Sequence, residues 1–103
     1  MEMPQSNPEK RIEFAGFKHI DESSMDMVKR VTDKHLRRII ELTRNLELLR
    51  ITLKPIHQRE KSEKYEIHVM TIDKGKIFAS EVTDRNLLTA IDSALNKIIN
   101  ELS

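Results

Sequence analysis

The chain has 103 residues, of which 38% are hydrophobic and 34% are charged, and its net charge is +1. This size and balance predict one domain with a single core and a heavily charged surface. The chain has no cysteine, which excludes disulfides and thiolate chemistry, and no apolar run is long enough to predict a membrane span.

The N-terminal residues predict a tail followed by a strand. Residues 1–9 contain two prolines and little that a core could bury, so we expect a flexible tail before a single domain of residues 10–103. Residues 11–17 alternate, with Ile12 and Phe14 on one face, and predict the first strand. The N-terminus lacks the basic-then-apolar pattern of a signal peptide, so we expect a cytoplasmic protein.

A long amphipathic helix is predicted over residues 24–44. Ser23 and Asp26 have the spacing of a capping box at its start, and Asn45 is a plausible stop. Helical spacing places one set of residues on the inner side: Met25, Val28, Val31, Thr32, His35, Leu36, Ile39, Leu42 and Thr43.

Three strands are predicted after this helix. Residues 46–55 and 65–72 alternate as strands do, and the polar residues 57–64 connect them. Residues 73–76 read as a hairpin turn, because Gly75 accepts a positive φ. Residues 76–82 alternate again and form the last strand.

The chain closes with a second amphipathic helix that ends near Leu102. Asn86, or Asp84 just before it, can cap its first turn, and Asp92 and Lys97 are expected on its outer side. Its apolar stripe comprises Leu87, Leu88, Ile91, Ala94, Leu95, Ile98, Ile99 and Leu102.

The predicted order is βαβββα. A crossover helix makes the first two strands parallel, and short connections make the last three an antiparallel meander. We therefore predict a two-layer α+β fold, in which two helices cover one face of a four-stranded mixed sheet with strand order 1-2-3-4.

The last third of the chain carries a more specific pattern: a strand with small residues, an acidic capping turn, and a helix that contains Ala-Ile-Asp followed by a lysine with an apolar residue and then a glutamate. Its residues are Ser80, Val82, Asn86, Leu87, Leu88, Ala90, Ile91, Asp92, Lys97, Ile98, Glu101 and Leu102. This pattern and the element order resemble the ribosome hibernation-promoting factor family, also called ribosome-associated inhibitor A. The resemblance implies a βαβββα domain that binds small-subunit rRNA and represses or stalls translation under stress.

Basic residues on the first helix are the candidate RNA contacts. The segment from Lys29 to Arg38 holds five basic residues and one acid, Asp33. Phosphate contacts by such residues would give salt-dependent affinity. The candidates are Lys29, Arg30, Lys34, Arg37 and Arg38, with Lys97 on the second helix. The alternative is a solvated helix face in which acids pair with bases four residues later, as in Asp26–Arg30 and Asp33–Arg37.

The remaining candidate sites favour structural roles. His35 lies on the inner stripe, where a partly buried, hydrogen-bonded histidine is expected; a role as a ligand or pH switch is the less favoured alternative. His57 and His68 have no cysteine or carboxylate at metal-ligand spacing, so no metal site is predicted. Tyr65 and Phe78 are expected to pack in the core rather than stack on bases. No catalytic constellation or Gly-rich phosphate loop is present, so we predict neither enzyme activity, nor a cofactor, nor a small-molecule substrate.

A second function remains open from the sequence alone. The sheet face that the helices leave uncovered would carry Leu48, Met70, Ile72, Ile77 and Ala79. Exposed apolar surface often marks a partner site. The alternative is thus a protein-interaction module, homodimeric through this face, without RNA binding.

Overall fold

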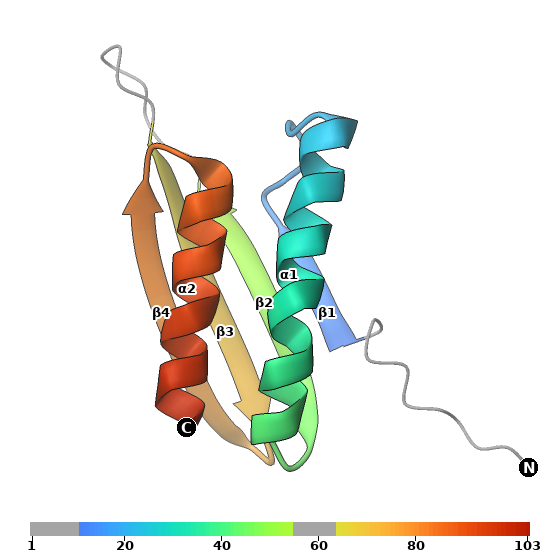
Figure 1. The fold of residues 1–103 in the computed structure, drawn as a ribbon, viewed down its shortest axis with the longest axis vertical. Helices are drawn as coiled ribbons and strands as arrows, with labels where there is room; N and C mark the ends of the chain where they lie inside the picture. Colours follow the sequence, from blue (N-terminus) through green and yellow to red (C-terminus); the bar gives the residue numbers. More distant parts are fainter. Residues whose placement is uncertain (1–10, 55–63) are drawn as a thin grey trace, which may run out of the picture.

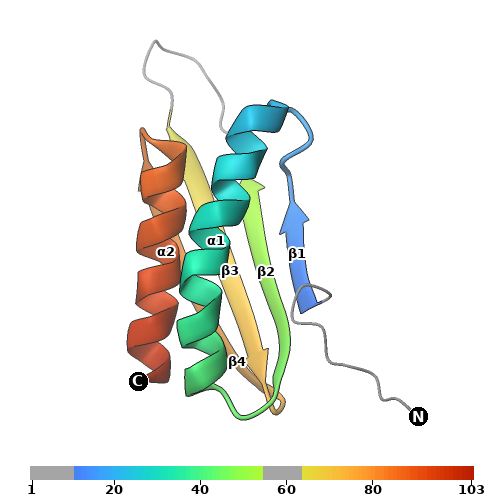
Figure 2. The same ribbon diagram turned by 45° about the vertical axis from the view of Figure 1, so that its right-hand side comes forward.

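The structure is a computed structural model in which residues 11–54 and 64–103 are described. These residues form β1 (Ile12–Ala15), α1 (Glu22–Leu42), β2 (Leu46–Lys54), β3 (Tyr65–Asp73), β4 (Lys76–Asp84) and α2 (Leu87–Leu102). The two helices lie side by side on one face of the sheet (Figure 1), and the turned view in Figure 2 shows the same layers. The predicted tail of residues 1–9 and the predicted connection as far as residue 63 lie outside the described residues.

The sheet has the predicted topology. Its strand order is β1-β2-β3-β4. β1 pairs with β2 in parallel, with Ile12 opposite Leu49, and the other two pairs are antiparallel. The hairpin between β3 and β4 turns at Lys74 and Gly75, whose φ angles of 52° and 81° are both positive, as tight hairpins prefer. The predicted α+β fold is therefore confirmed.

The first helix begins and ends two residues earlier than predicted. Its N-cap is Asp21, whose carboxylate accepts a hydrogen bond from the backbone N–H of Ser24 at 3.1 Å. The predicted cap, Ser23, instead donates its hydroxyl to Asp21 at 2.8 Å. An aspartate in extended backbone geometry satisfies the orphan amides directly, so the predicted capping box does not form. The predicted stop at Asn45 is also wrong, because Thr43 is the C-cap.

β1 is shorter than the predicted strand because of Gly16. This residue has a φ of 83°, which ends the extended geometry after Ala15. The chain then turns so that Phe17, which is 7% exposed, packs into the core. Its ring meets that of Phe14 edge to face, with centroids 5.7 Å apart.

The core lies between the helices and the inner face of the sheet. The buried apolar residues are Phe17, Val28, Leu36, Ile39, Leu46, Leu49, Ile51, Ile67, Val69, Ala90, Ile91, Ala94, Leu95 and Ile98.

The second helix begins where it was predicted to begin. Asn86 caps α2, and its side chain accepts a hydrogen bond from the backbone N–H of Thr89 at 2.9 Å. None of the described helices is long and apolar enough to cross a membrane.

Candidate nucleic-acid interface

The outer face of α1 carries the centre of the predicted basic site. The buried residues Val28 and Ile39 turn one side of the helix to the core. At 3.6 residues per turn, Arg30, Lys34 and Arg37 fall within about 60° of one another on the opposite side. All three side chains belong to exposed residues. The fold therefore presents three cations together on the surface.

These cations are not neutralised by the pairs that a merely solvated helix face would use. Neither Asp26–Arg30 nor Asp33–Arg37 forms an ion pair in the described part of the chain. The predicted site residues that make no ion pair with another described residue are Lys29, Arg30, Lys34, Arg37 and Lys97. Phosphate oxygens could therefore bind α1 without first displacing a carboxylate.

Arg38 and Lys97 differ from the four basic residues of α1 that make no ion pair in the described part of the chain. Arg38 forms an ion pair with Glu41 at 3.3 Å on the exposed surface of α1. Lys97 lies on the side of α2 that faces β4, where its ammonium donates to the backbone carbonyl of Glu81 at 3.2 Å. Because α1 lies on the other side of α2 (Figure 1), the structure does not bring Lys97 together with the basic residues of α1.

A histidine–aspartate contact joins α1 to α2. Nε2 of His35 lies 2.6 Å from Oδ1 of Asp92. The His35 side chain is 10% exposed and that of Asp92 is 44% exposed. The prediction that His35 is a partly buried, hydrogen-bonded histidine is confirmed. Asp92, predicted on the outer side of its helix, keeps a half-exposed side chain but contacts α1 from the flank of α2.

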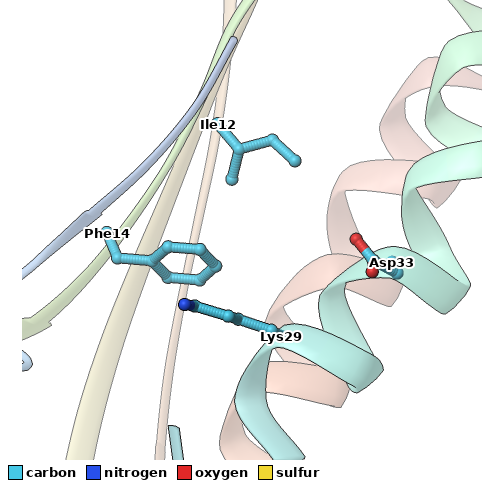
Figure 3. Close-up of a pocket in the computed structure, with 4 residues that line it drawn as sticks. All are labelled: Ile12, Phe14, Lys29 and Asp33. Carbon is cyan, nitrogen blue, oxygen red and sulfur yellow. The ribbon is translucent and has the colours of Figure 1, made fainter. Parts of the chain in front are cut away.

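A pocket of about 310 Å³ opens between β1 and α1. Its lining residues are Ile12 and Phe14 from β1, and Lys29 and Asp33 from α1. Figure 3 shows Lys29 extending from the helix toward the ring of Phe14, and Asp33 projecting into the same gap. No pattern in the sequence predicts this pocket, because its two walls come from separate elements and no motif joins them.

The uncovered sheet face holds a cluster of one histidine and two glutamates that was not predicted. Ligand atoms of Glu66, His68 and Glu81 all lie within 4.8 Å of one another. The prediction that His68 has no carboxylate at metal-ligand spacing is therefore wrong. Glu66, two positions earlier on the same strand, and Glu81, opposite on the neighbouring strand, lie on the same face of the sheet as His68. Nε2 of His68 lies 2.6 Å from Glu66, whereas Nδ1 lies 4.0 Å from Glu81. The carboxylates thus face different ring nitrogens, an arrangement that suits an ion pair better than one shared metal.

The same sheet face has an apolar end, as predicted. Leu48, Ile72 and Ile77 lie opposite one another in a row across β2, β3 and β4. Met70 and Ala79 are paired beside this row. Ile77 is 62% exposed, the highest value among the large hydrophobic residues of the described chain.

Comparison with known proteins finds similarity in structure alone. No family model and no curated protein matches the sequence. The Protein Y N-terminal domain of Thermus thermophilus is similar at a TM-score of 0.60 and 16% identity, over 88% of this chain and 91% of that chain. A ribosomal subunit interface protein from Coxiella burnetii is similar at a TM-score of 0.60 and 8% identity, over the same shares of 88% and 91%. These similarities confirm, at the level of the fold, the likeness predicted from the sequence: the chain has the fold of these two proteins.

Proposed function

We propose that this protein is a ribosome-associated factor that binds small-subunit rRNA through the outer face of α1 and represses or stalls translation. The observation that carries the proposal is the group of exposed cations on α1 that make no ion pair in the described part of the chain. The fold supports it, because one of the similar structures is that of a ribosomal subunit interface protein. A factor with this role would work in the cytoplasm.

The physical basis is the release of counterions from the RNA backbone. Each phosphate that a lysine or arginine neutralises frees condensed cations, which makes affinity fall steeply with salt. Contacts of this kind set the position of a protein on RNA without reading its bases. The proposed contact should therefore depend on α1 charge and ionic strength more than on rRNA sequence.

The test is co-sedimentation with ribosomes after charge reversal on α1. The variant Arg30→Glu, Lys34→Glu, Arg37→Glu should fold normally, because all three residues are exposed. We expect it to lose most of its co-sedimentation at about 0.1 M salt, where surface charges act over about 10 Å. The slope of log affinity against log salt concentration should also become shallower by about 2 to 3, because three phosphate contacts are removed.

A matched variant separates this local effect from net charge. Arg44→Glu, Lys64→Glu, Arg85→Glu makes the same change in charge at exposed residues outside the helices. It should retain most of the parent's ribosome binding. Equal losses in the two variants, or a parent that does not bind ribosomes, would show that the protein does not bind ribosomes through the basic residues of α1.

A second candidate function is self-association through the uncovered sheet face. The observation that favours it is the apolar row of Leu48, Ile72 and Ile77, in which Ile77 is exposed and the other two are partly exposed. A second copy of the chain could cover this row, since apolar surface of this kind often marks a protein contact. Such a dimer would leave α1 free, so the two functions do not exclude each other.

A further inference from the structure

The pocket between β1 and α1 combines an apolar wall with a charged one. Ile12 and Phe14 supply the apolar wall from the strand, and Lys29 and Asp33 supply the charged wall from the helix. Lys29 also belongs to the basic residues of α1. The pocket thus opens beside the surface that is proposed above to follow the RNA backbone.

The two charged side chains are available to a ligand. Lys29 and Asp33 are four residues apart on a helix, a spacing at which opposite charges often pair. Neither makes a hydrogen bond or an ion pair with another residue in the described part of the chain. The Asp33 carboxylate therefore keeps its acceptor capacity, and the Lys29 ammonium keeps its three donors.

This combination defines the chemistry of the ligand. An aromatic ring beside a gap suits a flat unsaturated ring, which can stack on Phe14. A carboxylate only accepts hydrogen bonds, so the edge that meets Asp33 must carry donors. Guanine presents two adjacent donors, its ring N1–H and its exocyclic amino group, whereas uracil presents one donor between two acceptors. An ammonium beside the ring suits the attached phosphate.

We propose that this pocket accepts an unpaired guanine nucleotide of RNA. Phe14 stacks on the base, Asp33 accepts from its Watson–Crick edge and Lys29 contacts its phosphate. A volume of about 310 Å³ lies at the lower end of the range for ligand pockets, which suits a single nucleotide base. The inference rests on the proposed RNA-binding function and adds a base preference to backbone contacts that have none.

The experiment compares two eight-nucleotide RNAs, UUUUGUUU and UUUUUUUU, by fluorescence anisotropy at about 0.1 M salt. We expect the parent to bind the guanine-containing RNA at least about fivefold more tightly, the lower end of the discrimination that a bidentate base contact gives. Asp33→Asn should reduce this ratio to near one, because the amide replaces one of the two accepting oxygens with an NH2 donor, which cannot accept from the second guanine donor. In the parent, the guanine RNA alone should shift the backbone NMR signals of Ile12 and Phe14.

Asp26→Asn is the matched control. Asp26 is an exposed acid on the same helix that does not line the pocket, and its substitution changes the net charge equally. This variant should retain the preference for guanine. Equal binding of the two RNAs by the parent, or a preference that survives Asp33→Asn, would overturn the inference.

Ribosome co-sedimentation distinguishes this inference from the proposed function. If the parent binds ribosomes through α1 but binds both RNAs equally, the guanine pocket is wrong and the proposed function stands. If the parent prefers the guanine RNA through Asp33 but does not bind ribosomes, the pocket stands and the ribosomal role is wrong.

Discussion

At the scale of single residues, Gly16 decides how β1 leaves the sheet. Its φ of 83° lies in the left-handed region, which side chains with a Cβ disfavour. A Cβ at this position would also overlap the backbone carbonyl of Leu53 on the neighbouring strand. Because this contact is with backbone rather than with a flexible side chain, the structure has little freedom to relax.

Gly16→Ala should therefore lower the free energy of unfolding by about 3 kcal/mol, which urea denaturation would measure. Gly75→Ala is the matched control, since Gly75 also has a positive φ but its Cβ would have no heavy atom within 4 Å. Gly75→Ala should lower the free energy of unfolding by about 1 kcal/mol, because only the backbone conformation disfavours a side chain there. Equal losses would mean that the close approach to Leu53 contributes nothing.

At the scale of elements, the start of α1 depends on one carboxylate. Hydrogen bonds from Ser23 and Ser24 lower the pKa of Asp21 from 3.8 to about 2. The carboxylate therefore binds protons less readily in the folded chain than in the unfolded chain. Its contribution to stability is fully present above pH 3.8 and is lost as the pH falls through about 2.

Asp21→Ala should lower the melting temperature of the protein at neutral pH. The gap between parent and variant should close as the pH falls toward 2, because the parent then loses its ionised cap. Circular dichroism melts across this range measure the gap. Asp21→Asn is the control, since an amide oxygen caps at every pH and its advantage over Asp21→Ala should stay constant. A parent–Ala gap that does not change with pH would contradict the role given to the carboxylate.

At the scale of the whole molecule, the two candidate surfaces lie on opposite sides of the sheet. The helices cover one face of the sheet (Figure 2). Ile77 belongs to the other face, since it is exposed and its neighbour Phe78 packs against the core. The exposed residues of α1 and the apolar row of the sheet can therefore be changed independently. This separation makes the two proposed functions distinguishable by mutation.

Ile77→Asp should leave ribosome co-sedimentation unchanged, because Ile77 lies on the face opposite α1. If the chain self-associates through this face, the same change should convert a dimer to a monomer in sedimentation velocity, since it places a charge in an apolar contact. Thr83→Asp, at an exposed position of the same strand and beyond the apolar row, is the control. Loss of ribosome binding in Ile77→Asp alone would move the RNA contact from α1 to the sheet.

The sequence by itself determined the elements and their order. Alternation marked the strands, helical spacing marked α1 and α2, and the turn at Lys74 and Gly75 and the cap at Asn86 follow from local chemistry. These features depend on residues within a few positions of each other. A helix that connects two strands crosses over the sheet and makes them parallel, which predicted the β1–β2 pair. Short connections then predicted that β3 and β4 follow in order as antiparallel neighbours.

Only the tertiary structure decided which side chains meet across elements. His35 and Asp92 are 57 positions apart in the chain, and no pattern in either helix predicts their contact. No local pattern predicts that Phe14 and Asp33 line one pocket. The same holds for the position of Lys97, which lies beside Glu81 and away from the basic face of α1. Periodicity tells which side of a helix faces the core, but the neighbours of its flanks depend on how two packed elements are rotated against each other. That rotation is set by the shapes of many core side chains together, which the sequence does not express locally.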